Sequence, residues 1–532
     1  MSSSKSLTQL DENSLLRSMT IEEKVGQLLM VHFHGKMANQ DSKQLIQNLK
    51  VGGIIYYTWA NELSCPHQVQ NLSLGLQKQT HKNRLNIPLL IAVDQEGGVV
   101  SRLQYGFTDF PGNWAIGRTN NPLLAQQSAY ALGQELKAVG INMNLAPVID
   151  INTSSHHPII GIRSFGSDPY TVSLFADYTL RGYQQAQMIA TLKHFPGHGD
   201  ACIDSHCHLP SLQKSQKELE STDLLPFKKL AQDVEVIMTA HLLVPALDPK
   251  RCSTLSEPTL TYLRENLNFQ GVILSDSLSM QAIAESCPSF EEAAIQALQA
   301  GCDMLLLGGK SLLESHSMLE FSLSDIQRIH HALVYAVKVG RISEQRLNQA
   351  VERILNLKKR YLSISQTKKL SIQQHVTTLD HQKIAQCIAS TALQITSGDP
   401  TCLNSVHHKQ LVVLAPQLLA QNIKNASLLE LSQKTQSWFY DLAPSYHDIS
   451  AAQYLTEQAD LALIFCYNAW KYEAQAALIQ AVLDLGKPVI LVSTRDPIDS
   501  SLFPHTYLTL TTFSPSLFSM QAVYKLLAGE CK

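Results

Sequence analysis

Several short apolar runs in the first 310 residues are each followed directly by Asp, Glu, Lys or His side chains. PLLIAV, MIATL, VEVIMTA and GVILS are such runs. If they are parallel strands of one sheet, the side chains after them meet at its carboxyl edge, where catalytic groups gather. Acids, bases and cations at one edge can bind a polar substrate and transfer protons. The side chains in question are Asp94, Glu96, Lys193, His194, His241 and Asp276.

The window 193–208 holds four of the twenty histidines of the chain. One interpretation is a metal site, because His, Cys and Asp all carry ligand atoms. The spacing matches no zinc signature, however, and the Pro/Gly-rich stretch contains no HExxH-type helix. A loop of acid/base histidines is favoured over a metal site and over a purely structural loop. The ligand candidates of the metal alternative are His194, His198, Cys202, Asp204, His206, Cys207 and His208.

The elements that would position these side chains alternate in kind along the chain. Short continuous apolar runs are typical of strands buried on both faces, and helical patterns lie between them. Eight such runs over about 300 residues predict a (β/α)8 barrel, with an open doubly wound sheet as the alternative. The runs are 27–33, 51–57, 88–95, 141–150, 188–195, 234–241, 271–278 and 303–309, and the clearest helical patterns are 20–29, 121–140, 289–301 and a long stretch at 324–363.

A second α/β pattern follows the barrel. We expect a catalytic barrel over 1–361, a linker over 362–380 and a smaller α/β sandwich domain over 381–532. The second domain has no chemical motif. Its His407–His408 pair and the cluster Trp438, Phe439 and Tyr440 are interpreted as surface and core. Its predicted strands are 392–397, 410–416, 462–467, 488–494 and 507–512.

Composition limits the classes of protein that the chain can represent. It has 532 residues, 45% hydrophobic and 16% charged, and a formal net charge of −3. This balance argues against a broadly basic nucleic-acid binder. No run reaches the ~18 apolar residues of a membrane span, and the N-terminus lacks the apolar core of a signal peptide. We therefore expect a cytoplasmic protein whose ten cysteines are reduced, with no nucleic-acid or membrane partner; the oligomeric state is not predicted.

Longer motifs resemble a known family. KHFPGHGDACIDSH at 193–206 matches the pattern KHFPGHG followed four residues later by DSH, and LSDSLSM matches an (S)D-x-LSM segment. With DQEGG at 94–98, IIGIRSFGSDP at 159–169 and GRISEQRLNQAVERIL at 340–355, they resemble the bacterial β-N-acetylglucosaminidases of glycoside hydrolase family 3 in their two-domain form.

The resemblance implies a mechanism and its catalytic residues. Retaining glycoside hydrolysis needs an anionic nucleophile and a proton donor on opposite sides of the scissile bond. The resemblance makes Asp276 the nucleophile and His206, polarised by Asp204, the acid/base. From the residues alone, Asp276 has a second interpretation as a helix N-cap, Asp204 as a turn former and His206 as an exposed loop histidine.

The resemblance also implies the substrate-binding residues, and no metal or other cofactor. Two departures from the family pattern occur beside them. DQEGG continues with Val99–Val100 where Arg-Val is usual, and Cys207 follows His206 where a second His is common. The residues expected to hold the N-acetylglucosamine ring are Asp94, Arg102, Arg163, Lys193 and His194.

The implied activity is release of N-acetylglucosamine from muropeptides during peptidoglycan turnover. The small-molecule substrate would be a saccharide or muropeptide containing this sugar. Alternatives are a β-glucosidase or other exo-glycosidase of the same family, a metal-dependent hydrolase using the His/Cys cluster, and a sugar-binding protein without catalysis. Because a neutral His would not repel phosphate as a carboxylate does, phosphorolysis is a further alternative.

Overall fold

Eight parallel strands form a barrel in the computed structural model, which describes residues 12–200, 209–309, 320–362 and 370–530. The sheet order is β10-β1-β2-β3-β6-β7-β8-β9, and a parallel bridge between Leu274 and Met304 links its two ends. The predicted barrel is therefore confirmed, and all eight predicted runs contain a strand. The strands are β1 (Leu29–Val31), β2 (Gly53–Tyr56), β3 (Leu90–Val93), β6 (Met143–Asn144), β7 (Ile189–Phe195), β8 (Val236–Thr239), β9 (Val272–Leu274) and β10 (Leu305–Leu307).

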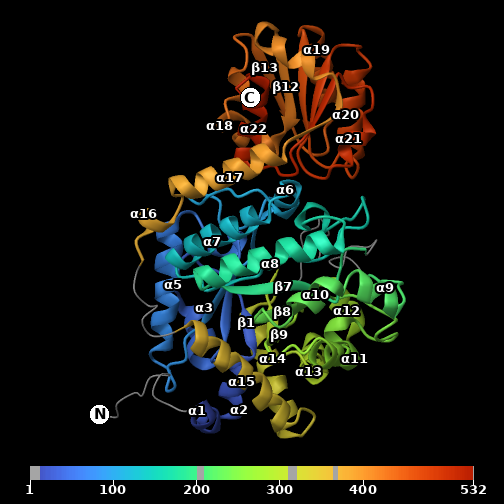
Figure 1. The fold of residues 1–532 in the computed structure, drawn as a ribbon. Coiled ribbons are helices and arrows are strands. Elements are labelled where there is room, and N and C mark those ends of the chain that lie inside the picture. The colour runs from blue at the N-terminus through green and yellow to red at the C-terminus, as the bar shows by residue number, and fades with distance from the viewer. Residues whose placement is uncertain (1–11, 201–208, 310–319, 363–369, 531–532) are drawn as a thin grey trace.

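The barrel strands are buried along their whole length, because helices cover the outside and side chains fill the inside. Two of the predicted helices begin at residues whose side chains cap them. Thr20 begins α2 (Ile21–Gln27) with a capping box, and Ser289 begins α13 (Phe290–Ala300), which ends at Gly301. The other long helices around the barrel are α5 (Pro66–Thr80), α7 (Pro122–Ala138) and α8 (Pro169–Ala186) (Figure 1).

The long helical stretch predicted over 324–363 is two helices, α14 (Leu323–Lys338) and α15 (Glu344–Tyr361). Gly340 lies between them with φ 78°, a left-handed conformation that ends α14. Ser343 then begins α15 by accepting a hydrogen bond from the backbone N–H of Arg346. The amphipathic periodicity continues across the break, which explains why one helix was expected.

A second sheet of six strands follows, in the order β11-β16-β15-β14-β12-β13. All neighbours are parallel except β11 and β16, and helices pack on both faces, so the predicted α/β sandwich is confirmed. β13 was not predicted. The strands are β11 (Gln394–Gly398), β12 (Leu411–Pro416), β13 (Thr435–Tyr440), β14 (Leu461–Cys466), β15 (Val489–Ser493) and β16 (Leu508–Thr511).

The second sheet stands at one end of the barrel, and α17 (Leu379–Ala392) runs between them (Figure 1). This helix contacts α6 (Asn113–Arg118) and α7 of the barrel, and also α22 (Leu517–Leu527) beyond the second sheet. The carboxylate of Asp109 accepts a 2.6 Å hydrogen bond from the backbone N–H of Leu517. Within the described residues, no helix combines the length and apolar character needed to cross a membrane.

Candidate active site

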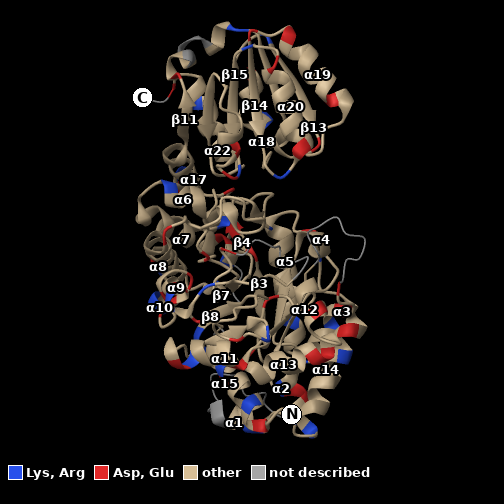
Figure 2. Cartoon of the chain, turned by 90° about the vertical axis from the view of Figure 1, so that its right-hand side faces the viewer, with Lys and Arg blue, Asp and Glu red and all other residues tan. Residues whose placement is uncertain are grey.

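The candidate site lies at the carboxyl ends of the barrel strands. Asp94 directly follows β3, and Lys193 and His194 are among the last three residues of β7. A short hairpin of β4 (Gln95–Gly97) and β5 (Val100–Ser101) extends from β3. Figure 2 shows acidic and basic residues side by side near β4, at the end of the barrel that faces the second domain.

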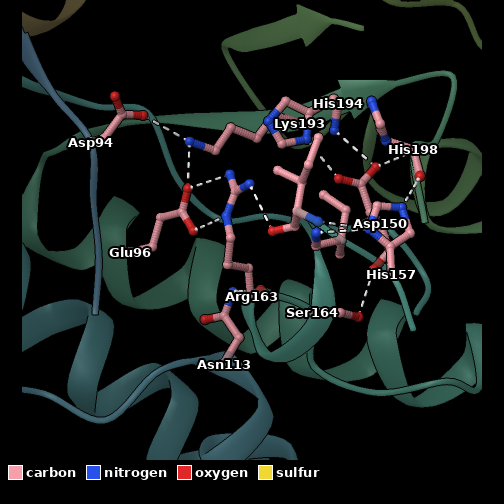
Figure 3. Close-up of polar contacts among 12 residues, drawn as sticks. Asp94, Glu96, Asn113, Asp150, His157, Arg163, Ser164, Lys193, His194 and His198 are labelled. Atoms are coloured by element: carbon pink, nitrogen blue, oxygen red, sulfur yellow. Dashed lines mark hydrogen bonds and ion pairs between the residues drawn. The ribbon is translucent and has the colours of Figure 1, made fainter. Parts of the chain in front are cut away.

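Lys193 and Arg163 share one buried carboxylate (Figure 3). The Lys193 ammonium donates to Asp94 Oδ1 at 2.8 Å and lies 2.7 Å from Glu96 Oε1. Arg163 donates to both oxygens of Glu96, from Nε and from Nη2, each at 2.9 Å. Burial would raise the pKa of Glu96, but the two cations hold this pKa well below its usual range. The network therefore fixes Lys193 with its ammonium beside Asp94.

Asp150, beyond β6, fixes the next part of the β7 segment. Its Oδ2 accepts from His194 Nδ1 at 2.6 Å, and its Oδ1 accepts from the backbone N–H groups of His194 and His198 at 3.1 and 2.7 Å. Burial would raise the pKa of Asp150, and the neighbouring histidines and N–H donors lower it to about 2. A proton on Nδ1 of His194 leaves Nε2 as an acceptor that a substrate hydroxyl can use.

The backbone of the KHFPGHG segment passes very close to the segment after β6. A Cβ on Gly199 would lie 1.8 Å from the carbonyl oxygen of Ile151, so no other residue fits without a backbone shift. The backbone carbonyl of His198 lies 2.9 Å from the Nε2 of His157, and burial lowers the pKa of His198 to about 3. His198 is thus a neutral part of the loop framework.

Arg102 is held by its backbone. The side-chain oxygen of Gln95 accepts from the N–H groups of Arg102 and Leu103 at 2.8 and 3.0 Å. Within the described part of the chain, Nε of Arg102 is buried with no hydrogen-bond partner. This donor is consistent with the substrate contact that the sequence predicts.

Asp276 lies two residues beyond β9 and is partly exposed. Its Oδ1 accepts from the backbone N–H of Ser277 at 2.7 Å. The buried His241, which sequence reasoning left unassigned, lies 2.8 Å from the carbonyl oxygen of Ser277 through Nε2. The alternative interpretation of Asp276 as a helix N-cap is wrong, because the next helix, α12 (Gln281–Ser286), begins after Met280.

The hydroxyl of Tyr57 is affected by the charges of both Asp94 and Asp276. Tyr57 directly follows β2, and burial together with the charges of Asp94 and Asp276 raises the pKa of its hydroxyl well above the usual value. The charges of Asp276 and Asp94 therefore act on one buried hydroxyl. This places the predicted nucleophile and part of the predicted sugar-binding set on the same side of the barrel.

Two of the predicted catalytic residues, Asp204 and His206, lie outside the described residues, as do Cys202, Cys207 and His208 of the metal alternative. The two ligand candidates that are described, His194 and His198, contact Asp150 instead, as given above. The other predicted site residues are all described, and they come from β7 and from the segments after β3, β5, β6 and β9.

The second domain reaches the loop that carries Arg163. A Cβ on Gly161 would lie 2.5 Å from Asp496 Oδ1, and the indole N–H of Trp470 donates to Asp496 Oδ2 at 3.4 Å. The Trp470 ring meets that of His156 edge-on at 5.3 Å. The second domain therefore braces the outer side of the Arg163 loop.

Sequence reasoning did not assign Glu96, Asp150 or Tyr57. Each follows a predicted strand run or ends one, so strand-end position is the signal that could have found them. Their partners lie on other strands, at separations of 44 to 97 residues for Asp150 and Glu96. The adjacency of β3, β6 and β7 in the sheet brings those groups together.

Comparison with known proteins identifies the class. Residues 20–357 match the family model "Glycosyl hydrolase family 3 N terminal domain". The chain therefore belongs to glycoside hydrolase family 3, and it is an enzyme of the glycosidase class.

The individual relatives are β-hexosaminidases. The chain is 35% identical over 304 residues to "Beta-hexosaminidase" of Pseudomonas aeruginosa (strain LESB58), covering 57% of this chain and 86% of that protein. It is 31% identical over 377 residues to "Beta-hexosaminidase A" of Pseudoalteromonas piscicida, covering 64% of this chain and 61% of that protein's length.

A solved structure matches both domains. A family 3 β-N-acetylglucosaminidase from Paenibacillus sp. str. FPU-7 has a TM-score of 0.86 at 32% identity, over 97% of this chain and 98% of that one. The resemblance stated from the sequence motifs is therefore confirmed, and the second sheet is part of the shared architecture.

Proposed function

We propose that this protein is a retaining exo-β-N-acetylglucosaminidase. Asp276 would be the nucleophile and His206, oriented by Asp204, the acid/base. The observation that carries the proposal is that Asp276 and the Asp94–Lys193 ion pair lie at the carboxyl ends of barrel strands, where Asp94 and Asp276 both act electrostatically on the buried Tyr57 hydroxyl. A nucleophile and a sugar-binding ion pair at one rim are what a glycosidase requires.

Substrate binding would use the preorganised network. Asp94 can accept hydrogen bonds from sugar hydroxyls, while Lys193 and Arg163 can donate to hydroxyls or to the acetamido carbonyl. Nε2 of His194 can accept from a hydroxyl because Asp150 holds the proton at Nδ1. The buried Nε–H of Arg102 would donate to the sugar, as Lys193 and Arg163 do. These groups are fixed before substrate arrives, so little reorganisation is needed on binding.

The first chemical step would form a bond between an Asp276 oxygen and the anomeric carbon, while the bond from that carbon to the leaving oxygen breaks. The His206 imidazolium would give its proton to that oxygen. In the second step neutral His206 would take a proton from water, whose oxygen displaces Asp276 and releases the sugar with retained configuration. Asp204 would stabilise the imidazolium that is present before the first step and forms again in the second.

We further propose that the natural substrates are N-acetylglucosamine-containing fragments of peptidoglycan, including muropeptides. This follows from the motif resemblance and from the β-hexosaminidase names of the relatives. The inward contacts of the second domain around Asp496 and Trp470 are consistent with its helping to shape the site.

Substitution of the nucleophile tests the function. Asp276→Asn should lower kcat/KM on nitrophenyl N-acetyl-β-glucosaminide by at least about 10³-fold, because the carboxylate is lost with little change of volume. Asp177→Asn, at a partly exposed carboxylate paired with Arg181, is the matched control and should retain activity.

Turnover of nitrophenyl β-glucoside, compared with that of the N-acetylglucosaminide, distinguishes the proposed function from a β-glucosidase. The wild type should favour the N-acetylglucosaminide strongly, whereas equal or greater turnover of the glucoside would replace the proposal by a β-glucosidase. Activity that disappears with chelator and returns with zinc would instead support the metal-dependent hydrolase.

A further inference from the structure

A second cluster of chemically active side chains lies at the carboxyl ends of β1 and β10. In the described part of the chain, His32, His34 and Glu320 are the group of three side chains whose potential metal-ligating atoms all lie within 4.8 Å of one another. Nε2 of His32 lies 3.0 Å from Oε1 of Glu320, and Nε2 of His34 is also in contact with that oxygen. Two imidazoles thus converge on a single carboxylate oxygen.

We propose that His32, His34 and Glu320 form a binding site for a divalent transition-metal ion of the zinc type. Two imidazole nitrogens and one carboxylate oxygen are a ligand set that suits such ions. The proposal is independent of the glycosidase mechanism, since none of the three residues belongs to the proposed catalytic or sugar-binding set.

The orientation of His32 supports a metal ligand. Its Nδ1 lies 3.4 Å from the carbonyl oxygen of Leu307, the last residue of β10, and a carbonyl can only accept. A neutral His32 that donates from Nδ1 has a lone pair on Nε2, directed at the carboxylate of Glu320. Two acceptors at 3.0 Å repel unless a proton or a metal ion lies between them, and the metal ion is the case proposed here. A carbonyl on the second ring nitrogen is also the usual outer contact of a metal-ligating histidine.

The cluster is held in place by close packing. The glycine after Leu307 allows the rings to approach, since a Cβ on Gly308 would lie 3.2 Å from His32 Nδ1 and 3.2 Å from the Tyr57 ring. Trp59 packs against both histidines, with ring centroids 5.2 Å from His32 and 5.5 Å from His34. The orientation of both imidazoles is therefore fixed by surrounding side chains.

The cluster is open on one side. The His32 side chain is 1% exposed, but that of His34 is 59% exposed and that of Glu320 is 27% exposed. An ion could thus enter from solvent and keep water as a further ligand, as three-ligand sites commonly do. A bound ion would connect the residues after β1 to Glu320, which precedes α14, close to Tyr57.

Metal titration of the full-length protein tests the site. Chelator-treated wild type is titrated with Zn²⁺ in competition with a chromophoric indicator, and Co²⁺ is added separately to record its visible absorption. The wild type should bind one more equivalent than His34→Ala and than Glu320→Gln. The 193–208 segment is the same in all the proteins, so any ion held there cancels in the difference.

Because His34 is exposed and Glu320 is partly exposed, these variants should fold, which circular dichroism can verify. His67→Ala removes an exposed histidine of α5 and should bind as the wild type does. Zinc should also raise the melting temperature of the wild type more than that of His34→Ala. Identical stoichiometry and affinity in the wild type and both cluster variants, including no binding in any of them, would overturn the proposal and leave a plain imidazolium–carboxylate cluster.

Discussion

The side chains of Asp150 and His194 connect the loop after β6 to the end of β7, with Oδ2 of Asp150 2.6 Å from Nδ1 of His194. The other oxygen of Asp150 accepts from two backbone N–H groups of the same segment. One buried carboxylate therefore sets both the path of the KHFPGHG backbone and the orientation of the His194 ring. Asp150 is a positioning residue in the proposed mechanism, because it acts through His194.

Replacing Asp150 should weaken substrate binding more than it slows chemistry. In Asp150→Asn the anionic acceptor at Nδ1 is lost, and His194 is no longer held with Nε2 as an acceptor. We expect kcat/KM for the N-acetylglucosaminide to fall by about 10- to 100-fold, mainly through KM, as found for other residues that orient a histidine. Steady-state kinetics measures the split. Asp233→Asn, an exposed aspartate before β8, should be neutral; an unchanged KM in Asp150→Asn would remove the positioning role.

The proposed acid/base predicts which step becomes slow. With a nitrophenyl leaving group little protonation is needed in the first step, so His206→Ala should form the glycosyl-enzyme but hydrolyse it slowly. Mass spectrometry of the quenched steady state should show a single N-acetylglucosaminyl adduct on the peptide containing Asp276. The double variant His206→Ala/Asp276→Asn is the control and should show none. An adduct on another residue would reassign the nucleophile.

Much of the barrel could be predicted because its strands are continuous apolar runs. β13 was missed because it is an edge strand without a continuous apolar run. Its exposed residues, such as Gln436 and Ser437, are consecutive and do not alternate with buried ones. In the site, strand-end position indicated Asp94, Lys193 and Asp276. It could not indicate which groups pair, because the contacts of Asp150 with His194 depend on the three-dimensional approach of neighbouring strands.

Lys358, at the opposite end of the barrel from the site, predicts a pH dependence of stability. It is fully buried on α15 and donates to Gln27 Oε1 at 2.7 Å, and burial lowers its pKa to about 7. Between this pKa and 10.5 the unfolded chain binds more protons at Lys358 than the folded one. The free energy of unfolding should therefore rise with pH in that range, by about 2 kcal/mol between pH 7 and 9.

Lys358→Met isolates this contribution. The variant has no titrating amine at the position, so the stability of the wild type relative to Lys358→Met should increase from pH 7 to 9. Calorimetric melting temperatures at matched ionic strength measure the difference. Lys82→Met, at an exposed position, should show no such trend. A difference that stays constant with pH would mean that the amine remains charged in the folded protein.

Asp109 predicts the opposite pH dependence at the contact between the domains. Burial raises its pKa to about 6, although the N–H of Leu517 at the start of α22 partly opposes this. Between its usual pKa near 4 and pH 6 the folded protein binds more protons than the unfolded chain. The free energy of unfolding should then fall as pH rises through this range, by about 3 kcal/mol in total, and stay level above it.

Asp109→Asn keeps an oxygen that can accept from Leu517 but removes the buried charge. It should therefore melt at a higher temperature than the wild type at pH 8, with the difference shrinking toward pH 4.5. Asp441→Asn, an exposed aspartate of the second domain, provides the comparison. Because Asp109 belongs to the barrel and Leu517 to the helix on the second sheet, the effect should appear in the transition that separates the domains. A lower melting temperature of Asp109→Asn at pH 8 would show instead that the negative charge at the α22 N-terminus stabilises the contact more than burial destabilises it.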